Sequence, residues 1–222
     1  MVYCSACCPG SEARGSTEMN LATRIVTAVF LCALAAGAAP AAGDQPRAVN
    51  YASSKFAFKY TVEKKISIDG EFRNFNAQVL LDEKKPESGS VRIDIDLTSI
   101  DTGSAENDTE VKRPRWFDIA SYPRASFVSS RIQRTAESRF EASGKLTIKG
   151  KSRDLVVPFT VTPTAGGGLS TQGRFVIKRL EFGVGDGPWS DITQVSDEVE
   201  VRFTIVLGPQ PAAKPEPRKS RS

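Results

Sequence analysis

The sequence predicts an all-β protein, an antiparallel barrel of about eight strands with one short helical segment. Between residues 54 and 207, most stretches alternate hydrophobic and polar residues, which is the two-residue period of a half-buried strand. The stretches are short and are separated by residues typical of turns and loops. Short alternating strands at close spacing are typical of antiparallel sheets that curl or close on themselves.

The first three strands are predicted before the helical segment. Residues 54–62 alternate aromatic or aliphatic side chains with polar ones, which predicts the first strand. Residues 66–70 are expected to form a turn. A second strand is predicted over residues 75–81 and a loop over residues 82–89. The third strand, residues 91–97, has the most regular alternation of the three.

A short helix is expected where the alternation stops. Residues 104–112 have Ser104 as a candidate N-cap, and Pro114 ends the segment. Residues 116–123 follow, an aromatic and turn-rich stretch. The helix is therefore predicted as a brief excursion between strands.

A hairpin centred on Lys149-Gly150 is the stretch around which the chain is organised. Phe140, Ala142, Leu146 and Ile148 share one face of its first strand. The second strand repeats this pattern with a set of alternating hydrophobic residues, namely Leu155, Val157, Phe159 and Val161. Gly150 tolerates the positive φ that a tight reversal needs. The hairpin therefore has one hydrophobic face, directed either at a packed core or at a bound molecule.

The remaining strands flank this hairpin in the sequence. Residues 125–132 predict a strand before it. After a loop at residues 166–168, alternation predicts strands near residues 173–178 and 198–207. A barrel of this size holds either packed side chains or one small ligand, and its polar outer face argues against a membrane-spanning barrel.

The composition excludes several kinds of chemistry. The chain of 222 residues has no histidine, which removes the commonest general base and metal ligand near neutral pH. Its four cysteines all lie within the first 32 residues, ahead of the predicted strands. The net charge of +4 is small and partly located in the tail, so nucleic-acid binding is not predicted.

The N-terminal 43 residues predict a cleaved secretory signal. Arg24 precedes a hydrophobic run that ends in small residues, with cleavage expected near residues 41–43. Met19 begins a more typical signal, so residues 1–18 are interpreted as a misassigned start. The mature protein is then periplasmic or secreted. It comprises a barrel over residues 44–208 and a disordered, proline-rich basic tail over residues 209–222.

Motifs that would indicate catalysis are weak. Asp94 and Asp96 alternate with hydrophobic residues on one strand, which indicates a solvated face and not an acid–base pair. Gly150-Lys-Ser152 lacks the first glycine of a phosphate-binding loop. No serine has a histidine as partner, and export would remove the cysteines. The prediction is therefore a binding module and not an enzyme, with no catalytic residue, metal ligand or cofactor.

Four motifs resemble the YceI-like family of periplasmic polyisoprenoid-binding proteins. They lie, in order, at residues 97–103, 116–129, 144–150 and 177–183, and the resemblance extends over residues 51–207. It implies a lipocalin-like barrel that encloses a polyprenyl lipid or isoprenoid quinone, for transport or storage. The chain departs from the family at Leu180-Glu181, at a histidine missing after the helix and at Pro114.

A set of inward-facing hydrophobic residues is predicted to line the lipid tunnel. Its members are Phe58, Tyr60, Phe75, Val79, Ile93, Ile95, Trp116, Phe117, Phe127, Phe140, Leu146, Phe159, Phe175 and Phe203. Burial of a branched prenyl chain against them would be favourable by about 25 cal/mol per Å². The alternative for each residue is that it fills a dry core.

Two other functions remain open at this stage. The first is an accessory role on a membrane redox complex of the cytochrome b561 type, with the lipid incidental and the tail as a candidate contact. The second is an enzyme, which would require Arg179, Glu181 and Asp186 to converge in a cavity. The predicted partners are thus an isoprenoid lipid or quinone, a membrane redox protein and a second copy of the chain. The head group and chain length are not fixed.

Overall fold

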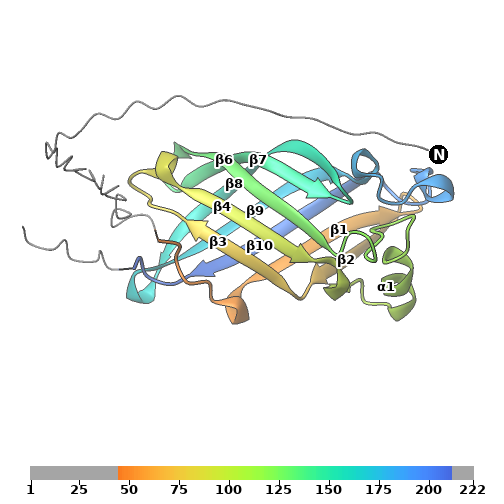
Figure 1. Ribbon diagram of the computed structural model, residues 1–222, viewed down its shortest axis with the longest axis horizontal. Coiled ribbons are helices and arrows are strands. Elements are labelled where there is room, and N and C mark those ends of the chain that lie inside the picture. Colours follow the sequence, from red (N-terminus) through yellow and green to blue (C-terminus); the bar gives the residue numbers. More distant parts are fainter. Residues whose placement is uncertain (1–44, 212–222) are drawn as a thin grey trace, which may run out of the picture. The chain divides into compact units, whose positions relative to one another are not determined.

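The computed structural model describes residues 45–211 and shows a ten-stranded antiparallel sheet, strongly curled, with one α-helix (Figure 1). The strands are β1 Lys55–Val62, β2 Ile66–Phe72, β3 Phe75–Leu80, β4 Ser90–Asp96, β5 Ile100–Asp101, β6 Arg124–Ala136, β7 Arg139–Ile148, β8 Lys151–Thr164, β9 Gly168–Lys178 and β10 Glu198–Leu207. The helix α1 is Ala105–Val111. Six 3₁₀ turns are Tyr51–Ser53, Pro86–Ser88, Leu97–Ser99, Ala165–Gly167, Arg179–Phe182 and Gly187–Ser190.

The predicted signal segment, residues 1–43, and the tail beyond residue 211 lie outside the described residues. Within residues 45–211, none of the helices combines the length and hydrophobicity that crossing a membrane would require.

The sheet runs in the order β3-β4-β6-β7-β8-β9-β10-β1-β2-β5. Its last strand, β5, follows β4 in the chain through the turn Leu97–Ser99, and it pairs with β2 through Phe72 and Ile100. Because β4 and β5 are nearly continuous, the two edges of the sheet are brought together on that side. Elsewhere, the segment before β1 links β3 to β10 through the bridges Arg47↔Val79 and Val49↔Leu207. The sheet therefore curls into the predicted antiparallel barrel.

The helix and the main hairpin follow the sequence prediction. Ser104 caps α1, and its side-chain hydroxyl accepts a hydrogen bond from the Asn107 amide at 3.5 Å. β7 and β8 pair continuously, and both residues of the turn between them, Lys149 (φ 49°) and Gly150 (φ 73°), adopt positive φ. The predicted reversal at Lys149-Gly150 is confirmed.

One predicted turn is wrong, because residues 66–70 belong to the strand β2. The chain reverses earlier, at Glu63 and Lys64, which adopt positive φ. Gly70 lies opposite Phe58 in the β1–β2 ladder, and a Cβ at Gly70 would lie 2.3 Å from the Phe58 ring. The glycine thus makes room for an aromatic ring inside a strand. β2 and the two-residue β5 account for the difference between about eight predicted strands and the ten observed.

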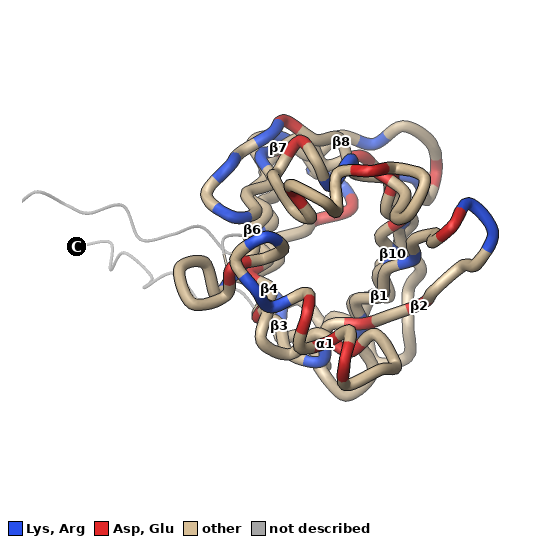
Figure 2. The backbone as a smooth tube through the Cα atoms, turned by 90° about the vertical axis from the view of Figure 1, so that its right-hand side faces the viewer, with Lys and Arg blue, Asp and Glu red and all other residues tan. Residues whose placement is uncertain are grey.

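The two ends of the barrel are packed differently. At the end where β6 turns into β7, the side chains of Leu81, Ile132, Phe140, Val161 and Leu207 have exposed fractions of 0–1%. We call this the packed end. The opposite end contains α1, the turn between β7 and β8, and residues 179–197, which connect β9 to β10. We call this the α1 end. Figure 2 looks onto it and shows the strands arranged in a ring.

An apolar cavity inside the barrel

A cavity of about 440 Å³ lies inside the barrel. Its wall includes residues of every strand, together with α1 and the connection 179–197. Leaving aside the aromatic residues, the lining residues with polar or charged side chains are Thr102, Asn107, Glu110, Ser126, Thr171 and Arg179. The other lining residues are aliphatic or aromatic. The volume falls in the range of about 300–1,000 Å³ that is usual for small-molecule sites.

Twelve of the fourteen residues predicted to line a tunnel do line this cavity. They are Phe58, Tyr60, Val79, Ile93, Ile95, Trp116, Phe117, Phe127, Leu146, Phe159, Phe175 and Phe203. They come from eight strands and from the segment after α1. Period-two alternation therefore identified the inner face of the wall, while the role of these side chains in holding a ligand stays a prediction.

Phe75 and Phe140 are not among the residues that line the cavity. Phe140 is 1% exposed, stacks on Phe159 with ring centroids 5.6 Å apart, and lies in the hydrophobic cluster of the packed end. Phe75 packs edge-on against Phe56 at 4.8 Å and against Tyr51 at 5.3 Å. Both rings face inward as the alternation predicts, but they pack against neighbouring aromatic rings and do not reach the cavity.

Several lining residues lie in turns, where no strand pattern marks them. They include Phe182, Val184, Trp189 and Val195. Trp189 contacts Trp116, with ring centroids 5.5 Å apart. Trp189, a large aromatic residue beside glycine and proline in a turn, was the one signal that could have indicated this part of the wall. These residues complete the cavity at the α1 end.

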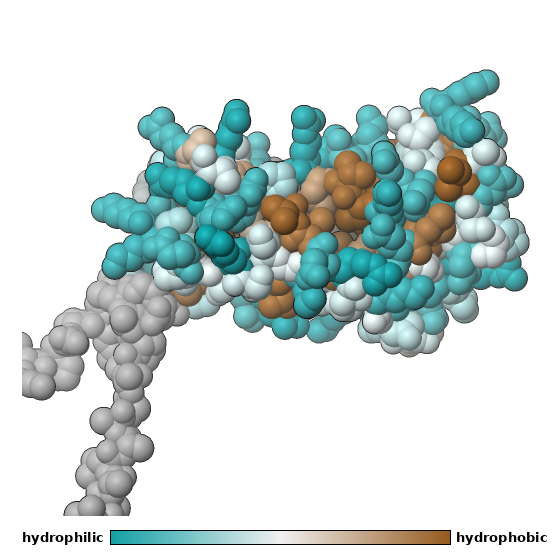
Figure 3. All heavy atoms as spheres, turned by 90° about the horizontal axis from the view of Figure 1, so that it is seen from above, coloured by the Kyte–Doolittle hydropathy of each residue, from teal (hydrophilic) through white to brown (hydrophobic). Residues whose placement is uncertain are grey.

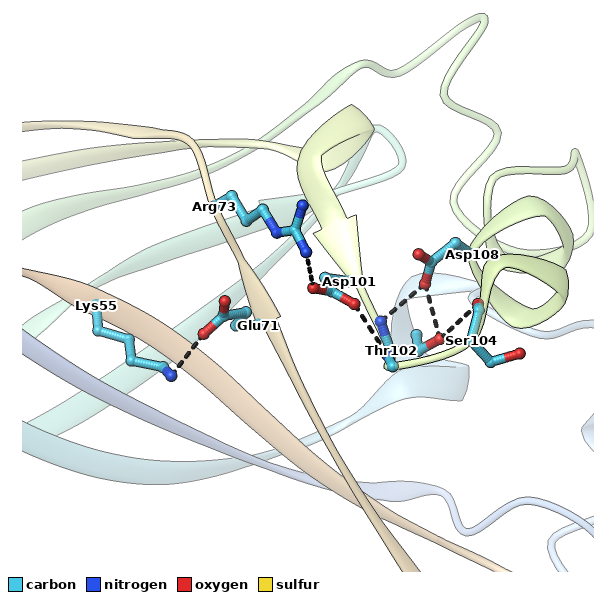
Figure 4. Close-up of polar contacts among 8 residues, drawn as sticks. Lys55, Glu71, Arg73, Asp101, Thr102, Ser104 and Asp108 are labelled. Atoms are coloured by element: carbon cyan, nitrogen blue, oxygen red, sulfur yellow. Dashed lines mark hydrogen bonds and ion pairs between the residues drawn. The ribbon is translucent and has the colours of Figure 1, made fainter.

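Polar contacts fix α1 to the end of β5 (Figure 4). The amide and the hydroxyl of Thr102 both donate to Asp108 Oδ1, each at 2.7 Å. The Thr102 hydroxyl also lies 3.3 Å from the carbonyl oxygen of Ser104, the N-cap of α1. These bonds hold the first turn of the helix against the strand. As a result, Asn107, Glu110 and Val111 are placed at the cavity wall.

Several polar side chains line the cavity at the α1 end. Tyr60 of β1, Asn107 and Glu110 all line the cavity there, and Glu110 forms an ion pair with Arg113 at 2.8 Å. Burial raises the pKa of the Tyr60 phenol above its ordinary value of 10.0, and the nearby charge of Asp108 adds to this effect. The Tyr60 hydroxyl is therefore a neutral hydrogen-bond donor at physiological pH.

Arg179 holds the connection 179–197 together. The side chain is 3% exposed, and its guanidinium donates to five backbone carbonyl oxygens at 2.7–2.9 Å, those of Val184, Gly185, Trp189, Val195 and Ser196. It also lies over the Trp116 ring at 5.5 Å. A guanidinium has five N–H groups, so every donor is used. Burial lowers the pKa of Arg179, and the charge of Asp197 counteracts this. Arg179 thus fixes the connection 179–197 at the α1 end of the barrel.

The cluster that an enzyme would require does not form. Arg179 is buried with all its donors engaged, whereas Glu181 and Asp186 are exposed and do not line the cavity. Asp94 accepts two hydrogen bonds from the guanidinium of Arg92, and it too lies outside the cavity wall. Within residues 45–211, no three His, Cys, Asp or Glu side chains lie close enough together to hold a metal ion. What the lining offers is apolar surface with a few hydrogen-bonding groups, most of which lie toward the α1 end.

Fold and cavity together define a lipocalin-like antiparallel barrel with an internal apolar cavity. The chain belongs to the YceI-like family, because the model of the YceI-like domain matches residues 48–207. Among curated relatives, a UPF0312 protein of Pseudomonas savastanoi pv. phaseolicola is 30% identical over 172 residues, which cover 72% of this chain and 90% of that protein.

Solved structures share the fold. Burkholderia cenocepacia BcnA is 38% identical with a TM-score of 0.69, covering 72% of this chain and 99% of BcnA. A domain from Saccharophagus degradans, described as polyisoprenoid-binding and implicated in plant cell wall breakdown, is 14% identical with a TM-score of 0.61. The alignment covers 74% of this chain and 99% of that domain. At that identity the likeness concerns the fold alone.

Proposed function

We propose that this protein binds a long isoprenoid lipid, a polyprenyl alcohol or an isoprenoid quinone, in the barrel cavity. The observation that carries the proposal is the cavity itself, about 440 Å³ of space lined almost wholly by aliphatic and aromatic side chains. A soluble core normally packs such side chains against one another. Here the interior of the barrel leaves room for a guest, and an apolar guest suits its walls.

The energetics favour a chain-like hydrophobic ligand. Removing about 400 Å² of apolar ligand surface from water would gain about 10 kcal/mol at 25 cal/mol per Å². The cost of association, about 4–15 kcal/mol, must be subtracted from this gain. The gain exceeds the lower part of that range, and it grows with each isoprene unit that is buried, so a long chain is favoured over a short one.

The distribution of polar groups sets the orientation of the ligand. Tyr60, Asn107 and Glu110 lie at the α1 end, and the closely packed cluster around Phe140 closes the other end. We place the head group next to Tyr60 and the tail toward the packed end. No hydrogen bond from the Tyr60 hydroxyl is present among the described residues, so this group is available to a ligand oxygen.

A neutral head group fits the site better than a phosphate. Phosphates in proteins are usually held by Arg or Lys side chains or by exposed backbone amides. Arg179 is the single cation among the lining residues of the described chain, and its five donors all go to backbone carbonyls. A diphosphate would therefore be buried without a partner. Quinones and alcohols need only hydrogen bonds.

We also propose that the protein is exported and acts as a carrier or store for this lipid, without catalysing a reaction on it. The predicted signal segment supports export. A docking site for a membrane redox protein and a homodimer remain predictions that no contact of the described residues favours.

The proposal predicts saturable binding of an isoprenoid alcohol. The two tryptophans of the chain, Trp116 and Trp189, both line the cavity, so intrinsic fluorescence should report its occupancy directly. Purified protein, delipidated and titrated with geranylgeraniol, should show a saturable change at one lipid per chain. Geranylgeranyl diphosphate, with the same tail, should bind at least about tenfold more weakly. If neither compound changes the fluorescence or co-purifies with the protein, the proposed function is wrong.

A further inference from the structure

The wall of the barrel is not hydrogen-bonded throughout its length between β8 and β9. β8 pairs with β7 from Lys151 to Thr160. Its pairing with β9 covers only Phe159–Thr164, opposite Gly173–Gly168. The first part of β8 and the last part of β9 therefore lie side by side in the sheet order without a ladder between them. β9 itself continues to pair with β10 as far as Lys178.

The sequence explains where this ladder stops. Pro158, next to the last paired residue of β8, has no N–H group and cannot donate to a neighbouring strand. Gly173, the last paired residue of β9, is covered by the Phe203 ring, to which a Cβ would approach within 2.6 Å. Beyond these two residues, a side chain of β8 contacts the turn that follows β9, because the Arg153 guanidinium donates to the Glu181 carbonyl of the turn Arg179–Phe182 at 3.0 Å.

We call the unpaired stretch between Pro158 and Arg153 the β8–β9 slot. At roughly 3.3 Å per residue it is about 17 Å long. Its outer rim carries two exposed hydrophobic side chains, Val156 and Val176, each 52% exposed, between charged residues such as Asp154 and Arg174. Figure 3, which looks onto the side of the barrel that carries β7 and β8 in Figure 1, shows hydrophobic side chains reaching the surface between polar ones.

The inner side of the slot is the cavity wall. Val157 of β8 and Phe175 and Ile177 of β9 line the cavity, and they alternate with the exposed Val156 and Val176. Hydrophobic side chains thus lie on both the outer and the inner side of the slot. Exposed valines in pairs along a strand edge are unusual on the outside of a soluble sheet, where polar residues normally cover edges.

Both ends of the barrel offer a worse route. The packed end is filled by side chains with exposed fractions of 0–1%. The α1 end is closed by the connection 179–197, which five hydrogen bonds of Arg179 hold in place, and by α1, fixed through Thr102 and Asp108. A long chain would have to thread lengthwise past these elements. Sideways passage through the slot breaks no backbone ladder; it requires breaking the contact of Arg153 with Glu181 and displacing hydrophobic side chains such as Leu155 and Ile177.

We propose that the β8–β9 slot is the lateral passage by which an isoprenoid chain enters and leaves the cavity. This inference rests on the proposed function, because it concerns the same cavity and ligand. When the lipid enters from the side, the whole length of its tail can move into the barrel in one step. The slot then closes behind it when Arg153 again reaches Glu181.

The test locks the slot chemically. The variant carries Val156→Cys and Val176→Cys in the full chain, with Cys4, Cys7, Cys8 and Cys32 replaced by serine, and is joined by a short bifunctional thiol reagent. Uptake of geranylgeraniol is followed by stopped-flow tryptophan fluorescence before and after joining. We expect the rate to fall by about tenfold or more on joining, with the equilibrium affinity nearly unchanged.

A matched control joins the same two strands where they are already paired. Thr162 and Ser170 lie opposite each other in the β8–β9 ladder. Joining the pair Thr162→Cys and Ser170→Cys should therefore leave the rate of lipid uptake unchanged. Arg153→Ala, which removes the contact across the slot, should speed uptake about threefold or more, whereas Arg139→Ala on β7 should not.

Two results would contradict the proposed passage, and the experiment distinguishes them. If the joined Val156–Val176 variant takes up lipid as fast as the unjoined one, and Arg153→Ala does not change the rate, the lipid enters elsewhere and the slot proposal fails while lipid binding stands. If the unjoined protein takes up no lipid at equilibrium, the proposed function fails and the passage with it.

Discussion

Replacement of Arg179 by methionine is expected to lower the free energy of unfolding by about 3–5 kcal/mol. The change leaves five backbone carbonyls of the connection 179–197 without their donor, and four of them belong to residues at or near the cavity, Val184, Gly185, Trp189 and Val195. Each unsatisfied buried acceptor costs about 1–3 kcal/mol. Water entering a loosened connection should recover part of that cost. Equilibrium unfolding in urea, followed by circular dichroism, measures the difference.

The matched control is Arg174→Ala, an exposed arginine on the same strand, β9, which should change the free energy of unfolding by less than about 0.5 kcal/mol. Arg179→Lys is informative as well, because one ammonium keeps the charge but offers three donors and cannot reach five carbonyls. It should recover only a minor part of the loss. An Arg179→Met protein as stable as the parent would contradict the role of Arg179 in fixing the connection 179–197.

Leu146→Glu is expected to reduce isoprenoid binding by at least about 100-fold. Leu146 is 9% exposed and lines the cavity in the middle of the hydrophobic cluster of the α1 end. A carboxylate there would face an apolar tail without a partner and would draw water into the cavity. Titration with geranylgeraniol, read by tryptophan fluorescence, measures the affinity.

The control places the same carboxylate one residue earlier, on the outer face of β7. Lys145 has an exposed side chain and pairs with the exposed Asp154, so Lys145→Glu should leave binding unchanged. A buried carboxylate at position 146 would also destabilise the barrel, so loss of binding alone does not separate the two effects. Leu146→Phe therefore serves as a second variant. It keeps the wall hydrophobic and narrows the cavity, so it should fold and bind a shorter tail in preference to a longer one. Unchanged binding in both Leu146 variants would show that this part of the wall does not contact the lipid.

The strands of the barrel were largely predictable, because each has one face toward water and one toward the interior. The same property explains the failure at residues 66–70. Gly70 was interpreted as part of a turn, yet it lies inside β2 beneath the Phe58 ring. Glycine marks close approach of a neighbour as readily as a reversal of the chain, and only the position of the opposing ring distinguishes the two. β5, with two residues, is too short to show any period.

Only the inward face of the cavity wall was predictable, and not the extent of the cavity along the barrel. Alternation tells which side chains point inward but not how far along the barrel they lie. Phe140 and Leu146 share one face of β7 and are about 20 Å apart along it. The first is enclosed in the packed end, while the second lines the cavity. The depth at which packing gives way to open space depends on side chains from all the neighbouring strands, which no single strand pattern contains.

The role of Arg179 could not be predicted from its own neighbourhood. Its five acceptors are backbone carbonyls between residues 184 and 196, and carbonyl groups are present at every residue. The β8–β9 slot has a clearer sequence signal, because Pro158 interrupts an otherwise regular strand. Its meaning emerges only once β9 is known to be the neighbour on that side.

The measurement that tests the central claim most directly is native mass spectrometry of the protein purified from its source without delipidation, together with organic extraction of the same sample. The account predicts one neutral isoprenoid lipid per chain, released on unfolding and identified by its mass ladder of isoprene units. Leu146→Glu should yield the apo mass alone, and Lys145→Glu the loaded one. Protein that is consistently empty, and that stays empty after incubation with geranylgeraniol or an isoprenoid quinone, would contradict it.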